Sequence, residues 1–227
     1  MSIKLVVFDI AGTTVRDKGS VAEAFMQAAG GFGITVPLEE VNKVMGFRKK
    51  EAIRILLDKF YLERKEDVEA LIEKIHDAFT RNMIDFYEQD VDLAPLPYAE
   101  ATFAWLKERD IKIALNTGFT RPITNTILKR LQWDRNGVID MVITSDEVPE
   151  GRPHPYMIAA IMQQLQVTDP TQVAKVGDTE VDVEEGRNAA CGLVVSVTTG
   201  AYTRSELEQY NPDIIIDSLA EFPPLIQ

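Results

Sequence analysis

One stretch near the start of the chain decides the fold, and it runs Lys4-Leu5-Val6-Val7-Phe8-Asp9-Ile10-Ala11-Gly12-Thr13-Thr14. Its first half is apolar and rich in β-branched residues, which predicts a buried strand over residues 4–8. An acid follows at the carboxyl end of that strand, where open α/β sheets bind their ligands. Gly12 permits a tight turn at this point. Asp9 is therefore a candidate functional residue, and a carboxylate that only caps a turn is the alternative for this motif taken alone.

Length and composition limit the class of protein. The chain has 227 residues, 45% of them hydrophobic, and a formal net charge of −12. These values favour one large folded domain, or a domain with a smaller one inserted. The acidic balance argues against a nucleic-acid-binding or membrane-surface role. A lone cysteine, Cys191, favours a cytoplasmic location, and we find no signal-peptide pattern or membrane-spanning run.

The pattern of apolar residues changes twice along the chain. Helical spacing is seen in segments 21–29, 38–44, 52–60 and 66–87, and Ser20 is the expected N-cap of the first. Beyond Pro97 the pattern alternates between helices and short apolar runs, with strands expected at 111–115, 138–143, 173–176, 193–197 and 213–216.

This alternation predicts an α/β fold with a doubly wound parallel sheet, that is, a Rossmann-like core. The first strand belongs to the same sheet, so the helical block is an insertion after it. We therefore predict a core of residues 1–15 and 96–227 and an inserted all-helical cap of residues 16–95.

Polar residues follow several of the predicted strands. Because the carboxyl ends of parallel strands meet at one edge, Asp9, Thr117 and the loop that carries Arg152 should lie close together. The Thr117 hydroxyl and the Gly118 N–H suit phosphate oxygens, and a guanidinium makes forked contacts to phosphate. This edge is therefore expected to bind an anionic phosphoryl group.

Acidic residues gather at the same edge. Asp178 and Asp182 stand four residues apart after the strand at 173–176, and with Asp9 they offer an oxygen-rich cluster. Such a cluster suits Mg²⁺, which would offset the charge of a phosphoryl group. Asp9 would then be a covalent nucleophile that forms an aspartyl-phosphate.

Four segments, in this order, resemble the motifs of the haloacid dehalogenase superfamily: Phe8-Asp9-x-x-Gly12-Thr13, Asn116-Thr117-Gly118, Arg152 and Gly177-Asp178-x-x-x-Asp182. The resemblance spans the whole chain, including the position of the cap. It implies a substrate contact at Thr13 and a metal ligand from the backbone carbonyl of Ala11. Phosphatases of this superfamily carry a general acid where this chain has Ala11, so the leaving group must be activated in another way.

Two stretches resemble a subgroup, the phosphonoacetaldehyde hydrolases, which cleave a carbon–phosphorus bond: Asp9-x-Ala11-Gly12-Thr13-Thr14-Val15 and Met45-Gly46-Phe47-Arg48-Lys49. The resemblance implies that Lys49 forms an imine with the substrate aldehyde and that Met45 and Gly46 lie beside the substrate. The His and Tyr of the subgroup's pattern are replaced here by Ala52 and Phe119, so proton transfer around the imine is left open.

Three alternatives to a Mg²⁺-dependent phosphonatase-like hydrolase remain. They are a phosphomonoesterase acting on a small phosphometabolite, a metal-independent dehalogenase, and a non-catalytic protein that binds a phosphometabolite. Asp178 and Asp182 argue against the dehalogenase, which needs no cation. The expected ligand is a small phosphonate or phosphate. The apolar cap helices also leave room for a homodimer.

Overall fold

The computed structural model describes residues 2–61, 67–135 and 137–226, and within them six strands form one parallel sheet. The strands are β1 (Leu5–Phe8), β2 (Lys112–Thr117), β3 (Met141–Thr144), β4 (Val173–Gly177), β5 (Leu193–Val197) and β6 (Ile214–Ile216). Their order is β3-β2-β1-β4-β5-β6, so β1 lies in the middle and pairs with β2 and β4. The predicted α/β class with a doubly wound parallel sheet is confirmed.

The third strand begins later than predicted. It covers Met141–Thr144 rather than residues 138–143. Asp140 precedes it, and its carboxylate accepts hydrogen bonds from the Ile113 N–H at 2.8 Å and the Lys107 amine at 2.8 Å. An acid that takes these donors fixes the start of the strand by side-chain hydrogen bonding, which the apolar pattern does not reveal.

Alternate residues of β1 supply both faces of the sheet. Val6 and Phe8 join the apolar cluster under α5 (Ala99–Lys107) and α6 (Arg121–Arg130). Leu5 and Val7 join the cluster on the other face, under α7 (Tyr156–Gln164) and α8 (Glu180–Asn188). The remaining described helix, α9 (Arg204–Leu207), follows β5. Burial on both faces explains why the strand has no alternation of apolar and polar residues.

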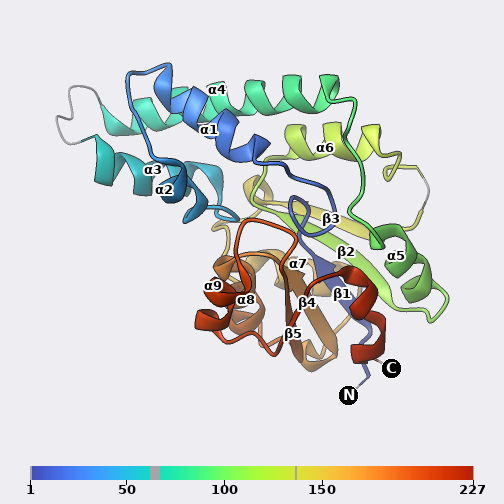
Figure 1. Ribbon diagram of the computed structural model, residues 1–227. Helices are drawn as coiled ribbons and strands as arrows, with labels where there is room; N and C mark the ends of the chain where they lie inside the picture. The colour runs from blue at the N-terminus through green and yellow to red at the C-terminus, as the bar shows by residue number, and fades with distance from the viewer. Residues whose placement is uncertain (1, 62–66, 136, 227) are drawn as a thin grey trace.

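The described residues of the inserted block form four helices, which Figure 1 shows above the carboxyl edge of the sheet. They are α1 (Ser20–Gly30), α2 (Leu38–Asn42), α3 (Lys49–Phe60) and α4 (Val68–Gln89). Residue 66, which the prediction included in the last of these helices, lies outside the described residues. Helix α4 packs on α6 as well as on α1 and α3, so the block and the core share one apolar cluster.

The chain enters and leaves this block along two adjacent segments. The Arg16 N–H donates to Ala94 O at 3.1 Å, and the Leu96 N–H donates to Thr14 O at 2.8 Å. The predicted boundaries at 15/16 and 95/96 fall at this paired crossing and remain predictions. None of the helices in the described part of the chain is long and apolar enough to span a membrane.

The start of α1 differs from the prediction. Gly19, with φ of 91°, occupies the N-cap position, and Ser20 is the first helical residue. The carboxylate of Asp17 accepts the N–H groups of Gly19 and Ser20 at 3.0 and 2.9 Å. Ser20 is therefore not the N-cap, because a preceding acid already satisfies the donors at this helix start.

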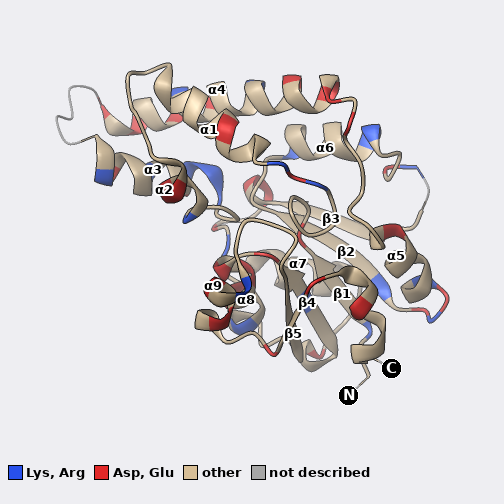
Figure 2. Ribbon diagram, viewed as in Figure 1, with Lys and Arg blue, Asp and Glu red and all other residues tan. Residues whose placement is uncertain are grey.

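Charges of both signs are interspersed along the helices of the block and the core, as Figure 2 shows. Acidic residues outnumber basic ones by 36 to 24. Attraction for an anionic ligand must therefore come from basic residues placed locally.

Candidate active site

A cavity of about 240 Å³ lies where the carboxyl ends of β1, β2 and β4 face the inserted helices. All of the residues predicted for the site line this cavity except Thr13 and Asp182. The convergence arises because parallel strands present their carboxyl ends to one edge, while the insertion after β1 folds back over that edge.

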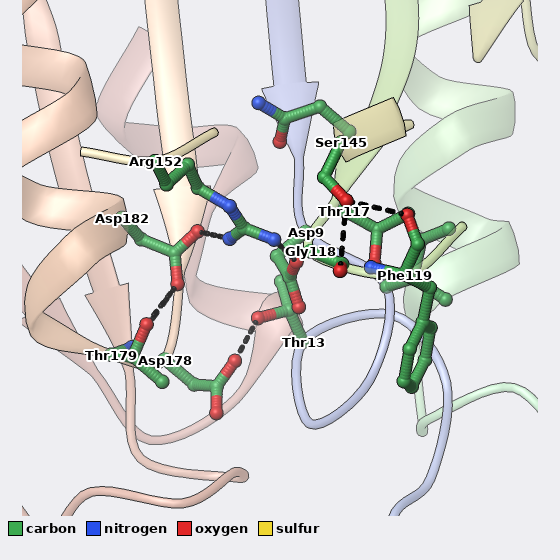
Figure 3. A network of polar contacts seen from close by, with 12 residues as sticks. Asp9, Thr13, Thr117, Gly118, Phe119, Ser145, Arg152, Asp178, Thr179 and Asp182 are labelled. Atoms are coloured by element: carbon green, nitrogen blue, oxygen red, sulfur yellow. Dashed lines mark hydrogen bonds and ion pairs between the residues drawn. The ribbon is translucent and has the colours of Figure 1, made fainter. Parts of the chain in front are cut away.

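Asp9 and Arg152 form the centre of the site, as Figure 3 shows. Both are buried, and Nη2 of Arg152 donates to Oδ1 of Asp9 at 2.6 Å. Burial raises the pKa of the Asp9 carboxyl, against the lowering effect of the Arg152 guanidinium. Among the described residues, Oδ2 of Asp9 has no hydrogen-bond partner. This oxygen can therefore bind a cation or attack a substrate.

Thr117 is arranged as a donor toward the cavity. Its Oγ1 accepts the Phe119 N–H at 3.1 Å, so its own hydroxyl hydrogen is left for another acceptor. Ser145 donates to the carbonyl of Gly118 at 3.0 Å and fixes the turn after β2 (Figure 3). The turn at Thr117 and Gly118 therefore has the rigid donor geometry that binds phosphoryl oxygens.

Asp182 is an ion-pair partner in this structure, and its role as a metal ligand stays a prediction. Its Oδ1 pairs with Arg152 and lies 2.9 Å from the Lys175 amine, and its Oδ2 accepts the Thr179 hydroxyl at 2.6 Å. Burial raises the pKa of Asp182, but the two cations outweigh it and bring the pKa to about 2. Both carboxylate oxygens are occupied, so Asp182 holds Arg152 in place.

Thr13 and Asp178 form a second buried pair. The Thr13 hydroxyl donates to Oδ1 of Asp178 at 2.8 Å, and the Ala201 N–H donates to Oδ2 at 2.8 Å. Burial and the nearby charges of Asp9 and Asp182 raise the pKa of Asp178 well above its usual range. Thr13 is fully buried and does not line the cavity, so the structure places its hydroxyl on Asp178 rather than toward a substrate.

A buried network behind the site was missed in the sequence analysis. Lys175 on β4 donates to the Asn116 side chain at 2.6 Å and lies 3.3 Å from Glu185. The Asn116 amide donates to both oxygens of Glu185, at 2.9 and 2.8 Å. Lys175 interrupts an apolar strand, and that anomaly is the one signal in the sequence that could have revealed the network.

Lys49 is the first residue of α3 and lines the cavity. The side chain is 3% exposed, and Nζ lies 5.5 Å from the Phe119 ring centre and 5.9 Å from that of Phe79. Burial and then the nearby Arg152 guanidinium lower the pKa of Lys49 to about 8. The amine is therefore partly neutral near physiological pH, as a nucleophilic lysine requires.

The cap loop that leads to Lys49 touches the core backbone. A methyl group on Gly118 would lie 2.4 Å from Phe47 O, and one on Gly46 would lie 2.5 Å from the Thr179 hydroxyl. Arg48 donates to Pro149 O at 2.9 Å. Glycine is required at these two positions because the cap and the core approach each other so closely.

The charges buried at the site suit a divalent cation. The described residues bury four carboxylates (Asp9, Asp178, Asp182 and Glu185) and three basic groups (Lys49, Arg152 and Lys175). The buried carboxyl groups therefore outnumber the buried basic groups by one. No group of three or more His, Cys, Asp and Glu side chains gathers as a metal cluster in the described residues. The candidate ligands are therefore two carboxylates, Asp9 and Asp178, with the Ala11 carbonyl.

Comparison with known proteins identifies the class. A family model for haloacid dehalogenase-like hydrolases matches residues 3–190, and the chain belongs to this family. The chain is 31% identical to the phosphonoacetaldehyde hydrolase of Bacillus mycoides (strain KBAB4), over 93% of this chain and 83% of that one. It is also 31% identical to the phosphonoacetaldehyde hydrolase of Bacteroides fragilis, over 99% of this chain and 96% of the other.

Solved structures agree on the fold. A hydrolase from Pseudomonas syringae superposes with a TM-score of 0.86 at 18% identity, covering 99% of this chain and all of that one. A phosphonoacetaldehyde hydrolase-like protein from Oleispira antarctica superposes with a TM-score of 0.81 at 23% identity, covering 100% of this chain and 92% of the other. The predicted family, fold class and hydrolase activity are thus confirmed.

Proposed function

We propose that this hydrolase cleaves the carbon–phosphorus bond of phosphonoacetaldehyde or a similar small phosphonate. Asp9 would be the phosphoryl acceptor, and Lys49 would form an imine with the aldehyde. The observation that carries the proposal is the position of Lys49: a buried amine with a lowered pKa lines the same cavity as Asp9.

The imine solves the problem of the leaving group. Cleavage of a carbon–phosphorus bond would release a carbanion, which is a poor leaving group. An iminium nitrogen next to the departing carbon accepts the electron pair, and the product is an enamine. Lys49 must be neutral to attack the aldehyde, and its burial and the nearby Arg152 guanidinium favour the neutral amine.

The opposite side of the cavity would carry out phosphoryl transfer. Arg152 holds one oxygen of Asp9 and leaves the other free to attack phosphorus. The hydroxyl of Thr117 and the guanidinium of Arg152 would bind phosphoryl oxygens. Water then cleaves the aspartyl-phosphate. The substrate would span the cavity, with its phosphonate toward Asp9 and its aldehyde toward Lys49.

We propose that Mg²⁺ is the cofactor, held by the carboxylates of Asp9 and Asp178 and by the Ala11 carbonyl. The excess of buried carboxyl groups over buried basic groups supports this. When bound, the cation offsets the repulsion between a carboxylate and a phosphonate dianion.

A phosphomonoesterase is the second candidate, and Ala52 and Phe119 favour it because they cannot transfer protons at an imine. Ala11 counts against it, since no acid stands beside Asp9 to protonate a leaving alkoxide. The buried amine of Lys49 also has no role in ester hydrolysis. The carbon–phosphorus reaction therefore uses more of the observed site.

The test is reductive trapping. Phosphonoacetaldehyde and borohydride should attach the two-carbon fragment or the whole substrate covalently to the chain, and peptide mass mapping should place it on Lys49. Lys50→Arg is the matched control, because Lys50 is the next residue but is exposed and paired with Glu73 at 2.7 Å. Lys49→Arg should abolish the adduct, and Lys50→Arg should not.

Label on Lys50 or on no residue, while the wild-type protein still hydrolyses small phosphate esters, would reject the carbon–phosphorus reaction. That result leaves phosphoryl transfer at Asp9 in place as an ester hydrolysis.

Two further expectations are part of this proposal. We propose a cytoplasmic location, since the single cysteine, Cys191, is free and buried. We also propose a homodimer formed through the cap, where Leu38 and Ile55 are 51% and 44% exposed. Light scattering of the pure protein tests the second expectation.

A further inference from the structure

We propose that Asp17 is the proton-transfer residue at the aldehyde end of the site, where it acts as general acid and base for the imine at Lys49. The inference rests on the proposed imine chemistry. None of the sequence motifs includes Asp17, which stands in the link between β1 and α1.

The cavity contains few groups that can transfer a proton. Its ionisable side chains are those of Asp9, Asp17, Lys49, Arg152 and Asp178 within the described part of the chain. Asp9 is the phosphoryl acceptor, Asp178 a candidate metal ligand, and Arg152 a permanent cation. Lys49 is the nucleophile. Asp17 is thus the remaining acid, and it lies on the cap side of the cavity with Lys49.

The position of Asp17 is fixed by hydrogen bonds. Its Oδ1 accepts the N–H groups of Gly19 and Ser20 at 3.0 and 2.9 Å. Gly19 adopts φ of 91°, with no atom near the position where a Cβ would stand, so its conformation serves this turn and not a packing contact. A carboxyl group held by backbone donors on a helix start is preorganised for proton transfer.

The surroundings of Asp17 suit this task. Burial raises the pKa of its carboxyl group, although the three N–H groups of Ser20, Val21 and Gly19 and the charge of Lys49 lower it. Tyr87 on α4 also interacts electrostatically with Asp17, and burial keeps that phenol protonated by raising its pKa well above the usual value. Lys49 has no carboxylate within 4.0 Å among the described residues. Asp17 and Lys49 thus line the same cavity and interact electrostatically without a direct ion pair, so an aldehyde in this cavity can meet both groups.

The proposed step is balanced. The neutral nitrogen of Lys49 attacks the aldehyde carbon, the carbonyl electron pair moves to oxygen, and that oxygen takes the proton of Asp17. The Asp17 carboxylate then removes a proton from nitrogen and gives it to the hydroxyl group, which leaves as water. The products are a protonated imine, water and the Asp17 carboxylate. After bond cleavage, protonation of the enamine carbon by solvent gives a protonated imine, whose hydrolysis reverses these steps and restores the proton to Asp17.

The experiment measures the rate at which borohydride traps the adduct on Lys49, together with turnover of phosphonoacetaldehyde, as a function of pH. Asp17→Asn should form the adduct roughly 100-fold more slowly or worse, since general acid–base groups contribute about 10²–10⁴-fold. The limb of the pH profile that reports a carboxyl group should disappear. Asp17→Glu should retain much of the rate.

Chemical rescue separates catalysis from structure. In Asp17→Ala, added formate should restore part of the lost rate, because a small carboxylic acid can occupy the space of the missing one. A variant damaged only in its fold would not respond. Asp92→Asn is the matched control, since this exposed acid pairs with the neighbouring Lys18 at 3.0 Å.

Each outcome decides the matter. If Asp17→Asn forms the adduct at the wild-type rate with an unchanged pH profile, Asp17 has no such role, while the proposed function stands. If Asp17→Asn does not fold, the other two variants are used. Asp17 has no proton-transfer role if the pH profile of Asp17→Glu is identical to that of the wild type, or if formate does not rescue folded Asp17→Ala. If the wild-type protein neither turns over phosphonoacetaldehyde nor forms an adduct, the proposed function itself fails, and this inference fails with it.

Discussion

Replacing Lys49 by methionine should stabilise the protein while it removes the imine. Lys49 is a buried amine with aromatic neighbours, and its pKa falls from 10.5 to about 8 because burial disfavours the charged form. A protonated amine buried at such a position lowers the stability of the folded protein. Methionine has a similar length, is apolar and packs well against aromatic rings.

The magnitude follows from linkage. The folded pKa lies about 2.5 units below the unfolded value, and each unit corresponds to about 1.36 kcal/mol, so the penalty below pH 8 is about 3 kcal/mol. The contacts of the ammonium group with Phe79 and Phe119 act in the opposite direction, by about 0.5–1 kcal/mol each. The penalty prevails, and Lys49→Met should gain about 1–2 kcal/mol at pH 7.

The pH dependence gives the sharper test. Because the folded pKa is depressed, the unfolded chain binds more protons between pH 8 and 10.5, and wild-type stability rises with pH through this window. The methionine variant has no ionisable group at this position, so its stability lacks this dependence on pH. Its advantage over the wild type should therefore shrink by about 2 kcal/mol between pH 7 and pH 9.5.

The assay is urea unfolding of the two proteins at both pH values, followed by circular dichroism. Lys50→Met is the control, since Lys50 is exposed and its pairing with Glu73 contributes little. A Lys49→Met protein that is less stable than the wild type at pH 7, or whose advantage does not change with pH, would refute the account of Lys49 as a destabilised buried amine.

Three more substitutions test the phosphoryl side. Asp9→Asn should abolish turnover without loss of fold, because the amide is no nucleophile, and measurable residual turnover would exclude an aspartyl-phosphate. Chelation of Mg²⁺ should stop turnover, and Asp178→Ala should raise the Mg²⁺ concentration needed by a large factor, as measured by titration with the metal; full activity in excess chelator would contradict this. Ala11→Asp should raise hydrolysis of phosphate esters by about 10²–10⁴-fold if leaving-group protonation limits it, and an unchanged rate in a folded variant would show that another step is limiting.

Much of the site could be predicted because its motifs are local. An acid at the end of an apolar strand, a Thr-Gly pair at the end of the next and an Arg in a proline-flanked loop are each visible in a few residues. The parallel sheet then brings them together without any further information. This is why Asp9, Thr117 and Arg152 line one cavity as expected.

The sequence could not reveal how the buried charges pair. Asp182 was expected to bind a metal, and the structure shows that it also pairs with Arg152 and Lys175, which the sequence did not indicate. A carboxylate has the same composition in both roles, and the choice depends on which cation lies within reach of its oxygens. The same holds for Thr13, whose hydroxyl is directed to Asp178 across 165 residues of chain.

The class of fold, the insertion after the first strand and the residues that end each strand can be predicted from sequence, because periodicity and turn chemistry act over a few neighbouring positions. The strand order, the lowered pKa of buried Lys49 and the position of Asp17 in the cavity lining become visible in the folded molecule. These features depend on burial and on distances between segments far apart in the chain, and burial is a property of the packed molecule rather than of any stretch of it.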